Sequence, residues 1–159
     1  MITGELLLRI LEDGLWSGIA AFGFALLFNV PRRALWACVL MGALGHMLRT
    51  LLLTQHLSIE ASTLIAATML GFLAKSFAAR LRMPSMIFAI CGSIPMVPGV
   101  YAYETMLGVL HLASAAPGAE LEAILHIASN GVKAGLILIA ISAGIAAPTL
   151  LIHRHKPII

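Results

Sequence analysis

The stretch AILHIASNGVKAGLILIAISAGIAAPTLLI at residues 123–152 decides the fold class. It is almost continuously apolar, and Lys133 is its one charged side chain. A helix needs about 20 apolar residues to cross the hydrocarbon core of a bilayer. The stretch is longer than that, and a tilt or an interfacial turn can absorb the excess. We therefore expect a transmembrane helix here.

Four further apolar segments precede this one. The chain of 159 residues is 60% hydrophobic and 11% charged, and its mean hydropathy is +1.00. Soluble domains contain about 25% charged residues. The sequence therefore predicts an all-α fold, a polytopic membrane helix bundle with about five transmembrane helices in a single transmembrane domain, residues 1–159. The four segments are Gly14–Val30, Ala34–Leu53, Ala61–Ala79 and Ser85–Leu112.

Lys and Arg gather at one end of these segments. Because positive loops stay in the cytoplasm, we expect a multi-pass protein of the cell inner membrane with its N-terminus outside and its C-terminus cytoplasmic. The residues predicted on the cytoplasmic side are Arg32, Arg33, Lys75, Arg80, Arg82, Arg154 and Lys156, whereas only Arg9 and Arg49 lie near the opposite ends.

The fourth segment contains Ile94-Pro95-Met96-Val97-Pro98-Gly99. Each proline removes a backbone donor and clashes with the preceding turn, so the sequence predicts a helix broken at Pro95–Gly99. At helical rise, the break lies roughly 17–23 Å from the cytoplasmic end, near the bilayer midplane. Many secondary transporters build substrate sites from such broken helices. The alternative is a proline kink that only shapes the bundle.

Two polar residues share a face of the second segment. His46 and Arg49 are spaced i, i+3, and His46 lies about 18 Å from the inner end. Because histidine titrates near neutral pH, His46 is a candidate proton carrier. A histidine that only hydrogen-bonds a neighbouring helix is the competing interpretation. A guanidinium can bind a carboxylate with two parallel hydrogen bonds, which suggests Arg49 as a partner for a substrate carboxylate.

The fourth and fifth segments each carry a charge at comparable depth. Glu104 and Lys133 both lie about 30 Å from the cytoplasmic ends. An unpaired charge is costly in hydrocarbon, so a Glu104–Lys133 ion pair is one hypothesis. The other is that both reach water at the outer interface.

Several function classes lack support in the sequence. There is no nucleotide-binding loop, nucleophile elbow or metal-binding motif, so we expect no metal, no cofactor and no enzyme activity. No basic cluster is dense enough for a nucleic acid. Cys38 and Cys91 stand alone in apolar segments, where we expect small buried side chains. Rings of like charge, which would favour a channel, are absent.

Short motifs in a fixed order give the chain a family resemblance. It resembles the small subunit of the threonine/serine exporter family along nearly its whole length, and Asn130 fits as well. The motifs are Phe28-Asn29-Val30-Pro31-x-Arg33-Ala34-Leu35, Gly45-His46-x-x-Arg49, Ser62-Thr63 and Ile94-Pro95-Met96-x-Pro98-Gly99, followed by Ala102-Tyr103.

The resemblance implies a function. Fused members have about ten helices in two halves, split members place the halves on two proteins, and this chain resembles the second half. It implies export of threonine and serine or, for the split type, of dicarboxylates such as succinate. The expected partners are a larger membrane subunit, the lipid bilayer and a small organic anion or amino acid. Glu104 and Lys133 match no family motif. The expected substrate-binding residues are His46, Arg49, Pro95, Pro98, Gly99, Tyr103 and Asn130.

We therefore expect the small subunit of a two-subunit, ion- or proton-coupled exporter. The main alternative is a structural or assembly subunit whose partner holds the whole transport pathway. A membrane-embedded enzyme would need a cluster of nucleophile, acid and base, and the sequence offers only isolated groups.

Overall fold

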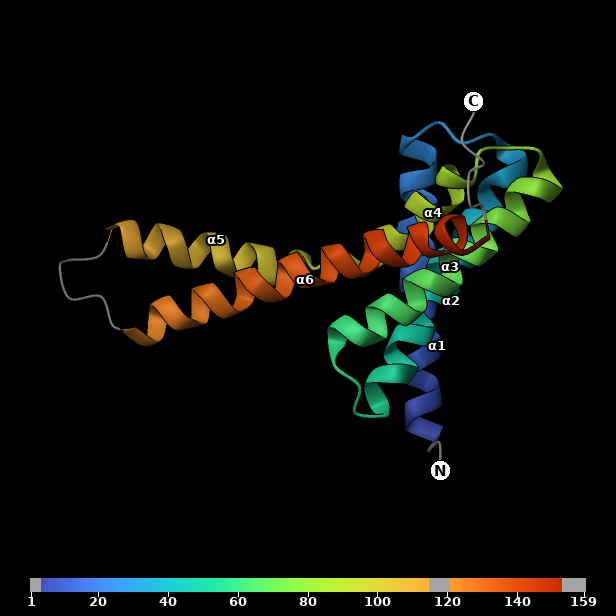
Figure 1. Ribbon diagram of the computed structural model, residues 1–159. Coiled ribbons are helices and arrows are strands. Elements are labelled where there is room, and N and C mark those ends of the chain that lie inside the picture. The colour runs from blue at the N-terminus through green and yellow to red at the C-terminus, as the bar shows by residue number, and fades with distance from the viewer. Residues whose placement is uncertain (1–3, 115–120, 153–159) are drawn as a thin grey trace. The chain divides into compact units, whose positions relative to one another are not determined.

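The computed structural model describes residues 4–114 and 121–152, and every element in these ranges is helical (Figure 1). The predicted basic tail with Arg154 and Lys156 lies outside the described residues. The elements are α1 (Gly4–Leu27), α2 (Arg32–Thr54), α3 (Ile59–Leu81), α4 (Ser85–Ser93), the 3₁₀ helix η1 (Ile94–Met96), α5 (Gly99–Ser114) and α6 (Leu121–Ile152).

The described helices confirm the predicted membrane fold. Four of them, α1, α2, α3 and α6, are long and apolar enough to cross a bilayer, and a fifth span results if α4 and α5 are counted together across their break. The predicted interruption of the fourth segment is confirmed, because helix geometry stops between Met96 and Gly99. The first helix begins at Gly4 rather than Gly14, so it also contains Asp13.

Local sequence explains where α1 ends and α2 begins. Asn29 adopts a left-handed conformation with φ 54°, which asparagine tolerates better than most residues. The Val30 N–H then donates to the Ala25 carbonyl at 2.9 Å and closes the end of α1. Pro31 follows as the N-terminal cap of α2, where its missing N–H costs nothing. The Phe28–Pro31 motif is therefore a sharp turn between two membrane helices.

The chain forms two compact units, and each is described by itself. Unit 1 comprises residues 1–96 and 140–159, and unit 2 comprises residues 97–139. Helix α6 contributes its C-terminal part to unit 1 and its N-terminal part to unit 2. The single transmembrane domain expected from the sequence remains a prediction.

Small residues let the helices of unit 1 approach closely. A Cβ added at Gly42 of α2 would lie 2.5 Å from the Ala21 Cβ and 2.9 Å from the Ser17 carbonyl oxygen of α1. One added at Gly144 of α6 would lie 2.8 Å from the Thr68 backbone nitrogen of α3. Glycine at these positions therefore brings the helix backbones together, as expected for association within lipid.

Two pairs of glycines that are four residues apart, one in each unit, differ in their packing. Gly14 and Gly18 of α1 both face α2, where added Cβ atoms would approach Met47 and Val39. In unit 2, Gly131 faces Thr105, but a Cβ at Gly135 would meet nothing within 4 Å. Only the first pair is therefore packed as a complete small-residue motif.

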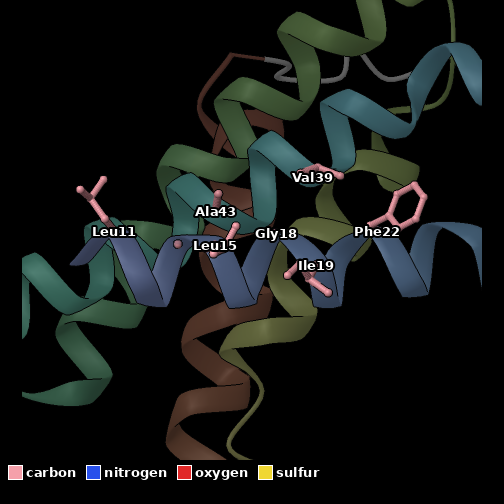
Figure 2. Close-up of a pocket in the computed structure, with 8 residues that line it drawn as sticks. Leu11, Leu15, Gly18, Ile19, Phe22, Val39 and Ala43 are labelled. Atoms are coloured by element: carbon pink, nitrogen blue, oxygen red, sulfur yellow. The ribbon is translucent and has the colours of Figure 1, made fainter. Parts of the chain in front are cut away.

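A shallow apolar groove runs along α1 and α2 (Figure 2). Its volume is about 450 Å³. The side chains of Leu11, Ile19 and Phe22 stand along it, and Gly18 and Ala43 leave it open.

Two cysteines that are far apart in the sequence meet inside unit 1. Cys38 of α2 and Cys91 of α4 are both buried free thiols, and they lie close enough to interact. The expected burial is confirmed, but their proximity could not be read from their isolated sequence positions.

Candidate functional site at the helix break

The break follows from the positions of its two prolines. Helix α4 ends at Ser93, and Pro95 is inside the short 3₁₀ turn η1. The Gly99 N–H donates to the Val97 carbonyl at 2.8 Å, and the first turn of α5 starts when the Ala102 N–H donates to Pro98 at 3.1 Å. The chain thus leaves helix geometry and re-enters it within a few residues. Such a break leaves backbone groups that need partners other than the usual helical ones.

Arg49 supplies one of these partners. Its guanidinium Nη1 donates to the carbonyl oxygen of Met96 at 2.8 Å. In a continuous helix that oxygen would accept a hydrogen bond from the residue four positions later. The Met96 side chain is fully buried, so the end of η1 is held against α2 by both packing and a charge-assisted hydrogen bond. Two predicted site elements, Arg49 and the break, are therefore in direct contact.

The next residue of α2, Thr50, binds an acidic residue of α1. The Thr50 hydroxyl donates to Asp13 Oδ2 at 2.9 Å and links α2 to α1. Asp13 and Thr50 also line a cavity of about 460 Å³ with Arg9, Glu12 and other residues of α1 and α2. Sequence reasoning missed Asp13 because it placed the start of the first helix after this residue. One signal for Asp13 was available, because an ionisable residue at the edge of an apolar segment is a candidate functional residue.

His46 belongs to the same group of polar residues. Its Nδ1 is buried and has no hydrogen-bond partner among the described residues. Arg49 and Asp13 are the charged groups that act on it electrostatically. The alternative interpretation, in which His46 only hydrogen-bonds a neighbouring helix, is therefore not supported at Nδ1. Unit 1 brings His46, Arg49, Asp13 and the Met96 carbonyl into one neighbourhood.

Unit 2 gathers other predicted residues on α5 and α6, which run side by side (Figure 1). The Asn130 amide donates to Glu104 Oε2 at 2.8 Å, and Asn130 is buried. The Lys133 Nζ lies over the Tyr101 ring, 5.8 Å from its centroid, within the range of a cation–π interaction. Tyr103 is 65% exposed.

The structure thus gives the two predicted ion-pair residues different partners. Among the described residues, Glu104 is bonded to Asn130 and Lys133 is stacked on Tyr101. A Glu104–Lys133 ion pair is not among their interactions, and it remains a prediction to be tested by charge exchange. Asn130, which is one of the expected substrate-binding residues, is held by its hydrogen bond to the Glu104 carboxylate.

The described residues contain no group of three or more His, Cys, Asp or Glu side chains that could hold a metal ion. The polar atoms gathered at the break are a guanidinium, an imidazole, a hydroxyl, a carboxylate and a backbone carbonyl. Such a set can bind a small charged solute and exchange protons.

Similarity to known proteins identifies the family of this chain. Residues 13–151 match the family described as threonine/serine exporter, ThrE. An uncharacterized protein of Haemophilus influenzae is 37% identical over 153 residues, which are 96% of this chain and 51% of that protein. The chain therefore spans about half the length of this curated relative. No solved structure matches. Because the match extends over most of the chain, the protein belongs to the threonine/serine exporter family of membrane transporters.

Proposed function

We propose that the chain is the smaller of two subunits of an inner-membrane exporter for small carboxylate-bearing metabolites. The substrates are dicarboxylates such as succinate, or threonine and serine. The family match supports export. A relative of about twice the length supports a second half supplied by a larger subunit. The protein acts by binding and moving its substrate rather than by converting it.

The contact between Arg49 and the Met96 carbonyl is the observation that carries the proposal. A substrate carboxylate competes with this carbonyl for the guanidinium, because a carboxylate carries the opposite charge and can accept two parallel hydrogen bonds from arginine. When the carboxylate binds, η1 loses its bond to α2. Substrate binding thereby releases η1, the segment that interrupts the membrane helix, from its hydrogen bond to Arg49.

His46 is the proposed carrier of the coupling proton. Its buried Nδ1 lies in the neighbourhood of both the carboxylate of Asp13 and the guanidinium of Arg49. A proton on His46 adds positive charge beside the proposed carboxylate site, and its loss removes that charge. Binding of substrate and of the proton are therefore linked through one cluster.

The orientation in the membrane follows the distribution of basic residues. Arg80 and Arg82 at the end of α3 face the cytoplasm in this proposal, and the N-terminus of α1 faces outward.

One observation favours a second candidate function, a structural or assembly subunit. Arg49 already binds a backbone carbonyl, as an arginine would if it only secured the break. In that case the larger partner holds the complete transport pathway, and this chain stabilises it.

Efflux of labelled succinate and threonine from loaded cells tests the proposal. Three conditions are compared: this chain expressed alone, the larger partner expressed alone, and both chains expressed together. Efflux of one compound only when both chains are present supports the two-subunit exporter and names its substrate class. Full efflux from the partner alone contradicts it and supports the assembly function. No efflux of either compound, despite a stable complex, excludes these substrates.

A further inference from the structure

A cavity of about 440 Å³ lies among α3, α4 and the C-terminal part of α6, all within unit 1. It is separate from the cluster around Arg49, and none of the residues proposed above for transport lines it. Most of its wall is apolar, with Ile90, Ile141 and Ile145 among the lining residues. Its polar wall residues are Lys75, Ser85, Ser142 and Thr149.

Lys75 is the unusual member of this wall. Its Nζ is buried and has no hydrogen-bond partner among the described residues. An ammonium group in such surroundings is costly unless an anion accompanies it. From the sequence, a lysine near a helix end would extend to the headgroup layer. The structure instead encloses the amine beside a cavity.

The beginning of α4 adds a second feature suited to an anion. Ser85 and Met86, the first two residues of this helix, line the cavity. The N-terminus of α4 has no side-chain cap, and the N-terminus of a helix presents backbone N–H groups and a partial positive charge. A lysine and a helix N-terminus on one cavity are a suitable pair for a phosphate group.

The position of the cavity indicates where that phosphate comes from. Ser85 follows directly after the turn that closes α3, and Thr149 lies in the last turn of α6. The cavity thus reaches the beginning of α4 and the end of α6. The end of α3 that carries Arg80 and Arg82 precedes α4 directly, and it is predicted to face the cytoplasm. Basic pockets between transmembrane helices on that side bind the headgroups of anionic lipids. The apolar walls suit the adjoining part of an acyl chain.

We propose that this cavity binds an anionic phospholipid, with its phosphate held by Lys75 and the N-terminus of α4. The lipid joins α3, α4 and α6 at their shared end. This site stands independently of the proposed transport function, because it requires neither Arg49 nor a partner subunit.

Binding is measured on the purified full-length protein in detergent, by native mass spectrometry and by the midpoint of thermal unfolding. The probes are phosphatidylglycerol, zwitterionic phosphatidylcholine and inorganic phosphate. We expect phosphatidylglycerol to bind at least tenfold more tightly than phosphatidylcholine and to raise the midpoint. Equal effects of the two lipids contradict the site, and equal stabilisation by inorganic phosphate at the same concentration overturns the assignment to a lipid.

Two variants locate the binding. Lys75→Gln is expected to weaken phosphatidylglycerol binding at least tenfold. Arg80→Gln, the matched control, removes the same charge from an exposed position of α3 outside the cavity, and it should leave binding within twofold of the unchanged protein. Equal losses in both variants would mean that total charge, not this cavity, attracts the lipid.

A third variant remains informative if Lys75→Gln fails to fold. Ala146→Leu fills part of the cavity without changing any charge. It should weaken phosphatidylglycerol binding at least tenfold, and unchanged binding in a folded Ala146→Leu protein overturns the proposal.

Discussion

Arg49 is the residue on which the two candidate functions differ most. Its guanidinium holds the Met96 carbonyl at the end of η1, and the proposed mechanism requires the same group to bind substrate. Arg49→Lys keeps the positive charge but loses the planar arrangement of donors. We expect Arg49→Ala to lower substrate affinity at least tenfold, about 1.4 kcal/mol, and Arg49→Lys to recover only part of it. Binding and efflux of labelled substrate measure this.

Arg80→Ala serves as the control, since Arg80 is exposed at the end of α3. Unchanged substrate affinity in Arg49→Ala, together with a lower unfolding temperature, would remove the carboxylate role and leave Arg49 as a structural residue.

The Asp13–Thr50 hydrogen bond offers a second test at this scale. Thr50→Val removes the donor to Asp13 Oδ2 and preserves the shape of the side chain. Hydrogen bonds to charged groups contribute about 1.5–3 kcal/mol, and we expect a loss of stability toward the lower end because both residues are partly exposed. Thr50→Ser keeps the hydroxyl and should retain most of the stability. Equal unfolding midpoints for Thr50→Val and Thr50→Ser would show that this bond contributes nothing.

In unit 2, substitutions can test whether Glu104 is paired with Lys133 or with Asn130. If Glu104 and Lys133 form an ion pair, Glu104→Lys combined with Lys133→Glu should restore the efflux that either single change reduces. The contacts favour Asn130 as the partner of Glu104. We therefore expect the charge exchange not to restore efflux, and Glu104→Gln with Asn130→Ala to be non-additive in stability by about 1.5–3 kcal/mol. Full recovery on charge exchange would reverse this assignment.

Among the elements, the packing of α1 on α2 depends on the absence of side chains at their contact. A methyl group at Gly42 would press on the Ala21 Cβ and on the backbone of Ser17. Overpacking of this kind costs about 1–3 kcal/mol, so Gly42→Ala should lower the unfolding midpoint in detergent. Gly23→Ala is the matched control, because a Cβ there meets nothing within 4 Å.

The control is expected to be neutral or slightly stabilising, since alanine favours a helix over glycine by about 1 kcal/mol. Similar destabilisation by both substitutions would mean that helix backbone freedom, rather than contact between α1 and α2, sets the effect.

The break is an element in which local and tertiary causes combine. Pro95 and Pro98 were sufficient to predict that the fourth segment could not remain a continuous helix. They did not indicate what would bind the backbone groups released there. That partner is Arg49 of α2, which lies 47 positions before Met96 in the chain. Only the packing of η1 against α2 brings the two residues into contact.

For the whole molecule, the orientation in the membrane is the main open prediction. Cys38 and Cys91 are buried, so they should react little with a membrane-impermeant maleimide. A cysteine introduced as Arg82→Cys should be labelled only after the cytoplasmic face is exposed, and His56→Cys should be labelled in intact cells from outside. Both positions lie in the turns that flank α3. The reverse labelling pattern would invert the proposed topology.

The sequence by itself determined the class of fold and the position of the break. Long apolar segments can satisfy their backbone groups in a membrane only as helices, and the two closely spaced prolines Pro95 and Pro98 interrupt the fourth segment. Both causes are local, so they could be read from composition and spacing. The family motifs were likewise visible, because they are short and ordered along the chain.

Only the tertiary structure decided which polar groups meet. Asp13 and Thr50, Arg49 and Met96, Asn130 and Glu104, and the thiols of Cys38 and Cys91 are each brought together by the rotation and approach of packed helices. These contacts depend on how far glycine and alanine let two backbones come together and on which face each helix turns inward. The sequence therefore shows which charged side chains need a partner in the membrane. The packing of the helices determines which residue that partner is.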